Sequence, residues 1–173
     1  MGYVARCVSH LARRNCDMVD RNRPYQTMSD TVFLALCIWR EARGEPRPGK
    51  EAVAMTVLNR LGRPYFKAKT VSDVLFKKWA FSSLTDPRDA QLTTWPKDGD
   101  PVWLECIEIA IQALTGMIEH PAPGADHYWD QSIKPPSWAT PASFVRKIGR
   151  INFHNLDKGK HDGPAILPSK TPD

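Results

Sequence analysis

The sequence predicts a mainly helical α+β domain that carries a small antiparallel β-ribbon. Three stretches have apolar residues at helical spacing, and two short stretches after them have strand character. The chain has 173 residues, 42% of them hydrophobic, which suits one globular domain with a proper core. We expect this domain at residues 28–156, between a basic N-terminal helix or arm at 1–27 and a C-terminal extension at 157–173.

The first two predicted helices follow each other closely in the sequence. Ser29 can cap a helix that runs to about Arg43, where Gly44 is placed to stop it. A second helix opens at Pro48 and keeps its apolar spacing up to Gly62. The two helices are therefore expected to be neighbours in the fold.

The middle of the chain combines a short helix, a long loop and a long helix. Thr70 is placed to cap a short helix at 71–78. The polar stretch 82–100 predicts a long loop with room for a helical turn, and loops of this length are often functional. Asp100 and Pro101 then start a helix of roughly 17 residues, which we expect to be the central support of the domain.

The strand character lies after His120, where prolines punctuate the sequence. Two short segments, 127–130 and 147–154, carry it. We expect them to form a β-ribbon or hairpin beside the helices.

The charge of the chain favours an anionic partner. Its net charge of +5 suits nucleic acid, a phospholipid surface or an acidic glycan, without choosing among them. No apolar run of about 18 residues predicts a membrane span, and the N-terminal stretch is too basic and polar for a signal peptide. We expect a soluble monomer that is made in the cytoplasm and does not insert stably into membranes.

Neither cysteine nor histidine spacing predicts a metal site. The four cysteines are widely spread, and Cys37 and Cys106 fall inside apolar helical patterns, so we expect them to be core thiols. His120, His127 and His154 form no HExxH motif and no other recognised ligand spacing. The sequence predicts no metal and no cofactor.

Glu41 is a candidate general acid. On a helix that ends near residue 43, it follows Leu34 by seven positions and Cys37 by four, so it lies on the apolar stripe. Partial burial and the negative end of the helix dipole would both raise its pKa, while Arg40 and Arg43 would oppose this if they face it. A carboxyl group that is protonated near neutral pH can protonate the leaving oxygen of a glycosidic bond.

Structural roles are the alternative for both glutamates of this stretch. Glu41 could pair with an arginine at the helix end, as helix-terminal glutamates commonly do. Glu45 lies beyond Gly44 and could cap, or pair with, the next helix.

Residues 41–60, EARGEPRPGKEAVAMTVLNR, resemble the signature of the SleB-type cell wall hydrolases, the family of spore cortex-lytic enzymes and phage lysins. Further matching motifs occur in the family's order and extend the resemblance over roughly residues 30–156. These motifs are WAFSSL at 79–84, ALTG at 113–116, GADHYW at 124–129, PPSWA at 135–139 and IGRINFHN at 148–155.

The resemblance implies a lysozyme-like fold and cleavage of the β-1,4 bond between N-acetylmuramic acid and N-acetylglucosamine in peptidoglycan. Glu41 matches the family's catalytic glutamate. In similar lytic transglycosylases, one glutamate protonates the glycosidic oxygen and then takes the proton of the muramic acid C6 hydroxyl, which gives a 1,6-anhydro product. A hydrolytic muramidase with water as acceptor is the alternative, and it needs a second carboxylate. The candidates for that group are Glu45, Asp86, Asp89 and Asp126.

Aromatic faces with polar groups nearby bind sugars, so we expect Tyr128, Trp129, Phe81 and Ser82 in the substrate cleft, with Glu45 in support. Core packing is the alternative for Trp129 and Phe81, and a turn or cap role is the alternative for Ser82.

Some other motif residues are expected to have structural roles, and two positions differ from the family's usual residue. Trp138, Asn59 and Arg60 are expected to have structural roles. Ala80 stands where the family usually has glutamine, and Ile151 where a histidine is often found, so substrate contacts at those points would differ.

The sequence leaves three hypotheses for the function. The first is a phage endolysin that waits in the host cytoplasm for release by a holin and then acts on peptidoglycan strands from the periplasmic side. The second is a nucleic-acid-binding module, although the sequence has no helix-turn-helix, zinc-finger or RNA-binding signature. The third is a wall-binding protein of this fold without activity, and the presence of Glu41 argues against it. We therefore expect a peptidoglycan partner and no nucleic acid.

Overall fold

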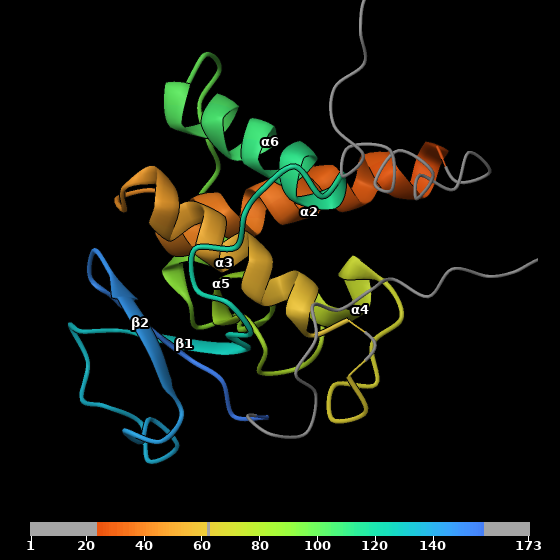
Figure 1. Cartoon of the computed structure of the whole chain (residues 1–173). Helices are drawn as coiled ribbons and strands as arrows, with labels where there is room; N and C mark the ends of the chain where they lie inside the picture. Colours follow the sequence, from red (N-terminus) through yellow and green to blue (C-terminus); the bar gives the residue numbers. More distant parts are fainter. Residues whose placement is uncertain (1–23, 62, 158–173) are drawn as a thin grey trace, which may run out of the picture.

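The computed structural model describes residues 24–61 and 63–157 (Figure 1). The body of the domain consists of helices α2 (Pro24–Ala42), α3 (Arg47–Asn59) and α6 (Pro101–Leu114). Three short elements connect them, namely α4 (Val71–Leu75), α5 (Ser82–Thr85) and the 3-10 helix η1 (Ala90–Thr93). An antiparallel sheet follows, made of β1 (His127–Asp130), β2 (Phe144–Ile148) and β3 (Ile151–His154). The predicted α+β class with a small antiparallel β element is confirmed.

Helix α2 is the central support of the domain. Residues 34–40 are all buried, and the helix packs against α3, α4, α5 and α6. The expectation that the helix after Asp100 holds this position is wrong, because α6 buries only one stripe. Leu104 and Ile111 of α6 are 58% and 45% exposed. The small residues Ala110 and Ala113 lie in the buried stripe, where they favour close packing of the helices.

The helix boundaries follow the predicted caps only in part. Thr70 and Asp73 form a reciprocal capping box at the start of α4, as the sequence predicts. Asp100 caps α6 by accepting a hydrogen bond from the amide of Val102. Ser29, however, lies inside α2, which begins at Pro24, so the predicted N-terminal boundary is wrong. The rest of the predicted arm, and the extension after residue 157, lie outside the described residues.

The sheet has one strand more than the two predicted segments. Its strand order is β1-β3-β2, and both pairings are antiparallel. The segment predicted at 147–154 spans the end of β2, a tight turn and β3. Gly149 has a φ of 56° in this turn, a conformation that glycine adopts without steric cost.

Two clusters of buried side chains form the core. The larger one lies between the helices and contains Cys37 and Cys106, so the predicted core thiols are confirmed. The smaller one joins α2 and α3 to the sheet through residues that include Ala42, Ile151 and Phe153. Tyr128 packs against both clusters. Of the helices in the described ranges, none is long and apolar enough to cross a membrane.

Candidate active site

Glu41 lies in the last turn of α2, where both of its carboxylate oxygens accept hydrogen bonds. The Ser83 hydroxyl donates to Oε1 at 2.5 Å, and the Tyr128 hydroxyl donates to Oε2 at 2.9 Å. The three residues come from α2, α5 and β1, so the carboxylate lies where the helical body meets the sheet.

The surroundings of Glu41 raise the pKa of its carboxyl group. Burial is the largest cause, because it disfavours the charged form, and the negative charge of Asp89 acts in the same direction. The hydrogen bonds from Ser83 and Tyr128 oppose this by stabilising the carboxylate, as does the positive charge of Arg60. Glu41 as a whole residue is partly exposed, whereas its carboxyl group is largely enclosed by its neighbours.

Arg40 fixes the position of Ser83. Its Nη1 donates to the backbone oxygen of Ser83 at 2.9 Å, and Nη2 and Nε donate to the backbone oxygens of Leu92 and Thr94 at 2.9 and 3.2 Å. Arg40 is only 7% exposed. One buried guanidinium group therefore holds both ends of the segment that supplies Ser83, next to Glu41 on the same helix.

Arg60, rather than Arg40 or Arg43, is the arginine whose charge stabilises the carboxylate of Glu41. Its guanidinium group lies over the rings of Phe66 and Phe81, and its Nε donates to the backbone oxygen of Asp126 at 2.8 Å. Arg60 thus has the predicted structural role, through its contacts with Phe66, Phe81 and Asp126, and its charge also stabilises the carboxylate of Glu41. Arg43 instead donates to the Gln91 side chain at 2.7 Å.

Tyr128 is held by the packing of its ring. The ring lies 5.8 Å from that of Phe153 and 6.5 Å from that of Phe81, measured between centroids. Burial, followed by the negative charge of Glu41, raises the pKa of Tyr128 well above its ordinary value. The hydroxyl therefore stays protonated and can donate to Glu41.

The serine that contacts Glu41 is Ser83, the neighbour of Ser82, which is predicted to lie in the substrate cleft. Ser82 is exposed, and its hydroxyl donates to Asp89 at 2.6 Å, so its predicted place in the substrate cleft stays a prediction. Ser83 is not among the residues predicted for the site, although it stands next to Ser82 in the WAFSSL motif. Phe81 is 3% exposed and lies in the larger core cluster, which corrects the expectation that its ring lines the cleft.

Trp129 points into a hydrogen-bonded group on the sheet. Its indole nitrogen donates to Nε2 of His154 at 3.1 Å, and Nδ1 of His154 lies 3.0 Å from the Ser143 hydroxyl. The ring of Trp138 packs 5.6 Å from that of His154, in agreement with its predicted packing role. Trp129 remains partly exposed, so its predicted contact with sugar stays a prediction.

Glu45 holds the turn between β2 and β3. Its Oε2 accepts a hydrogen bond from the backbone amide of Arg150 at 2.9 Å. A Cβ atom at Gly149 would lie 1.9 Å from the same oxygen, so only glycine permits this approach. Glu45 therefore ties the hairpin to the start of α3.

The other candidate carboxylates take part in contacts of their own. Asp126 is 1% exposed and pairs with Arg63 at 2.7 Å. Asp86 pairs with Arg88 at 2.8 Å, and these contacts lower its pKa to about 2. Asp89 caps η1 through the amide of Gln91 and is the acidic residue whose charge raises the pKa of Glu41.

The predicted structural residue Asn59 joins α3 to the segment before the sheet. Its amide nitrogen donates to the backbone oxygen of Ala125 at 2.7 Å and lies 2.7 Å from Nε2 of His120. Within the part of the chain that the structure describes, no three histidine, cysteine or acidic side chains are grouped so that they could hold a metal ion.

Comparison with known proteins shows the family to which the chain belongs. The profile of the family described as Cell Wall Hydrolase matches residues 44–154, beginning three positions after Glu41. The chain belongs to the cell wall hydrolase family. This confirms the family expected from the EARGEP motif and its successors.

Relatives of this cell wall hydrolase include two spore cortex-lytic enzymes. That of Halalkalibacterium halodurans is 31% identical over 127 residues, which are 73% of this chain and 35% of the relative. That of Bacillus subtilis is 31% identical over 143 residues, 81% of this chain and 42% of the relative. The chain thus spans less than half the length of these curated relatives.

Two solved structures share the fold. The catalytic domain of the germination-specific lytic transglycosylase SleB from Bacillus anthracis has a TM-score of 0.60 at 26% identity and covers 79% of this chain and 100% of its own. The catalytic domain of the Bacillus cereus SleB protein has a TM-score of 0.58 at 28% identity, with coverages of 74% and 91%. The expected lysozyme-like fold of the cell wall hydrolase is confirmed.

Proposed function

We propose that this chain is a peptidoglycan glycosidase that cleaves the β-1,4 bond between N-acetylmuramic acid and N-acetylglucosamine as a lytic transglycosylase. The observation that carries the proposal is the carboxyl group of Glu41, which has a raised pKa and accepts hydrogen bonds from Ser83 and Tyr128, on a residue that is partly exposed as a whole. The family match and the relatives named as cortex-lytic enzymes support peptidoglycan as the substrate.

The first step needs Glu41 as an acid. Its raised pKa increases the protonated fraction near neutral pH, so the carboxyl group can give its proton to the glycosidic oxygen as the bond to C1 of muramic acid breaks. The hydroxyl donors Ser83 and Tyr128 then stabilise the carboxylate that forms.

The second step needs the same group as a base. The carboxylate takes the proton of the C6 hydroxyl of the muramic acid, whose oxygen bonds to C1 and closes the 1,6-anhydro ring. The proton that left Glu41 is thereby replaced, and no water is consumed. Asp86 and Asp126 are engaged in ion pairs, and Glu45 accepts a hydrogen bond from a backbone amide. Because these carboxylates have structural contacts of their own, they support a scheme in which Glu41 is the one carboxylate that acts.

A hydrolytic muramidase is the second candidate, and Asp89 is the observation that favours it. Its negative charge raises the pKa of Glu41, so among the candidate carboxylates it is the one with an electrostatic influence on Glu41, and a hydrolytic reaction would need such a second carboxylate. Mass spectrometry of the released muropeptides separates the two reactions. Anhydro ends support the transglycosylase, whereas reducing ends overturn it in favour of hydrolysis.

Turbidity loss of purified peptidoglycan tests the proposal as a whole. We expect Glu41→Gln to lower the clearing rate by at least about 100-fold, because a general acid contributes that much or more to such reactions. Glu119→Gln makes the same chemical change at an exposed glutamate and should clear walls like the wild type. Failure of the wild type to clear walls, or equal clearing by Glu41→Gln, would contradict the assignment.

The proposal also covers how the enzyme reaches the cell wall. We propose an endolysin that reaches the wall after a holin permeabilises the membrane, and the net charge of +5 would help it to bind an anionic envelope. Named relatives are spore cortex-lytic enzymes, so a spore role is the competing assignment. Expression in a bacterial host with and without a holin tests this, since lysis without the holin would contradict the endolysin role.

A further inference from the structure

We propose that a pocket beside the C-terminal part of α2 is a second sugar-binding site, which takes a unit of the glycan strand at a distance from Glu41. The identity of the ligand rests on the proposed function. The site would allow the enzyme to prefer long glycan strands over short fragments.

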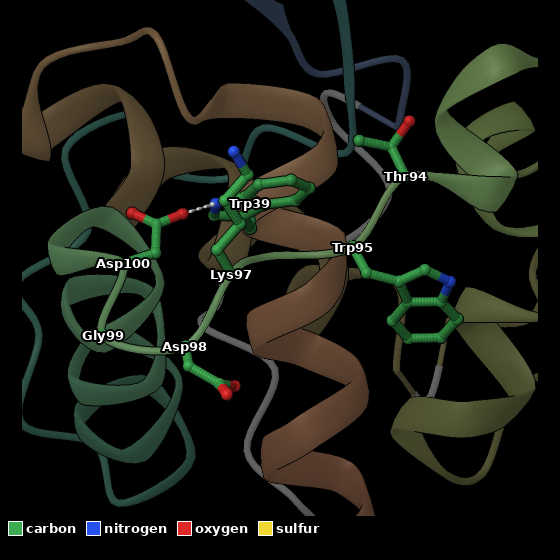
Figure 2. Close-up of a pocket in the computed structure, with 7 residues that line it drawn as sticks. All are labelled: Trp39, Thr94, Trp95, Lys97, Asp98, Gly99 and Asp100. Atoms are coloured by element: carbon green, nitrogen blue, oxygen red, sulfur yellow. Dashed lines mark hydrogen bonds between the residues drawn. The ribbon is translucent and has the colours of Figure 1, made fainter.

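The pocket lies between α2 and the segment that leads into α6 (Figure 2). It is an open depression with a volume of about 480 Å³, which leaves room for a sugar unit. The lining residues are Trp39, Thr94, Trp95, Lys97, Asp98, Gly99 and Asp100. Trp39 donates a hydrogen bond from its indole nitrogen to Asp100 at 2.9 Å, which fixes the wall of the pocket that α2 provides.

Trp95 supplies an aromatic surface at this pocket. The residue is 65% exposed, although burial of an indole ring is strongly favourable. The guanidinium carbon of Arg40 lies 4.8 Å from the ring centroid, so the indole is held against a buried, hydrogen-bonded side chain. A large, supported and exposed aromatic ring is suited to pack against the apolar face of a sugar.

Polar groups for the edge of a sugar lie on the same segment. Lys97 and Asp98 are exposed, and in the described part of the chain their side chains make no hydrogen bond. An ammonium group and a carboxylate can donate to and accept from the hydroxyl and acetamido groups of a glycan. Figure 2 shows the indole of Trp95 pointing away from Lys97 and Asp98, so the aromatic ring and the polar groups would contact neighbouring parts of a bound strand.

Arg40 links this pocket to Glu41. Trp39, Arg40 and Glu41 are consecutive on α2, and the guanidinium group of Arg40 contacts both Trp95 and the backbone oxygen of Ser83. Ser83 in turn donates to Glu41. Since Glu41 does not line the pocket, a sugar bound there would be a distal part of a strand whose scissile bond lies at Glu41.

Binding to insoluble peptidoglycan in the Glu41→Gln background tests the site without turnover. We expect an added Trp95→Ala change to raise the apparent Kd about tenfold, equivalent to about 1.4 kcal/mol, and an added Trp95→Phe change to restore most of the affinity. Trp79→Ala is the matched control, because Trp79 is 70% exposed and does not line the pocket. An unchanged Kd for Trp95→Ala, or an equal loss for Trp79→Ala, would overturn the proposal.

Kinetics with active enzyme separate substrate binding from a structural role of Trp95. We expect Trp95→Ala to raise KM on long glycan strands about tenfold with kcat within about twofold, and to leave the rate on short oligosaccharides unchanged. A fall in kcat with an unchanged KM would mean that Trp95 acts through Arg40, which overturns the proposal. If Trp95→Ala lowers the Tm strongly, the double change Lys97→Ala and Asp98→Ala takes its place, with the same expected rise in KM.

These experiments distinguish failure of the second sugar-binding site from failure of the proposed function. If wild-type enzyme clears walls and Trp95→Ala binds them normally, the second site fails and the function stands. If Glu41→Gln binds walls in a Trp95-dependent way but the wild type does not degrade them, the site stands and the glycosidase assignment fails.

Discussion

The hydroxyl of Tyr128 donates to Oε2 of Glu41 at 2.9 Å, although the two residues are 87 positions apart in the chain. This bond joins the first strand of the sheet to the last turn of the central helix. The sheet thus contributes directly to the environment of the proposed acid, and changes in it should alter the chemistry at Glu41.

Tyr128→Phe should move the pH profile of peptidoglycan cleavage upward. The phenylalanine keeps the ring packing but loses the donor that stabilises the carboxylate, so the pKa of Glu41 rises further. Because activity falls as Glu41 loses its proton, the high-pH limb should shift to higher pH. We also expect kcat/KM to fall about tenfold. Rates measured across pH check this, and a limb that stays in place would argue against Glu41 as the acid.

Ser83→Ala and Ser82→Ala form a matched pair of neighbouring changes. Ser83→Ala removes the donor to Oε1 of Glu41 and should lower kcat/KM about tenfold. Ser82→Ala removes only an exposed contact with Asp89 and should change the rate less than about twofold. Clearing assays at matched concentrations compare the two, and equal effects would contradict the position of Ser83 at the site.

Glu41→Gln should stabilise the fold at neutral and alkaline pH. The folded-state pKa of Glu41 lies above the ordinary value of 4.5, so its protonation favours the folded state below that value. This contribution is lost as the pH rises through the folded-state pKa. At pH 7–8 we therefore expect the Tm of Glu41→Gln to exceed that of the wild type by roughly 2–4 °C, as is common where function costs stability.

Thermal melts as a function of pH check this expectation. The difference in Tm should disappear below about pH 4, where the wild-type carboxyl group is protonated in both states. Glu119→Gln, at an exposed position, should show no such dependence. A Glu41→Gln variant that is less stable than the wild type at pH 8 would mean that the carboxylate is needed for folding.

Gly149→Ala should destabilise the domain, whereas Gly44→Ala should not. Alanine at Gly149 would have to adopt a φ of 56° and would place its Cβ 1.9 Å from Oε2 of Glu45. We expect a loss of about 1–3 kcal/mol in the free energy of unfolding. A Cβ at Gly44 meets no atom within 4 Å. Denaturant unfolding of both variants compares them, and equal stabilities would show that the turn is not held as described.

The sequence predicts those parts of the fold that depend on local signals. Apolar spacing locates the three long helices, and Thr70 marks the start of α4 because a capping box is a local contact. The start of α2 is missed because Ser29 has the chemistry of a cap but lies within a longer helix. The central position of α2 is missed as well, since its residues 34–40 are buried on every side and this stretch therefore has only a weak amphipathic pattern.

The site is predictable only as far as Glu41. Its place on the apolar stripe makes it a candidate acid, and the EARGEP resemblance matches it to the family's catalytic glutamate. The choice between Ser82 and Ser83 depends on which way a short helix turns, and Arg40 sets this by binding backbone oxygens that no sequence pattern reveals. The role of Tyr128 depends in the same way on a contact between distant parts of the chain.

The hydrogen bonds of Arg40 separate the chain before α6 into a part that should not tolerate changes in length and a part that should tolerate them. Backbone oxygens of Ser83, Leu92 and Thr94 are bound by one guanidinium group, so an insertion between them would have to break that arrangement and displace Ser83. Residues 96–99 lie outside it and are mostly exposed, whereas Trp95 still packs against Arg40. This short stretch is therefore the place where the domain can gain or lose residues, and with them new substrate preferences, while Glu41 keeps its hydrogen bonds.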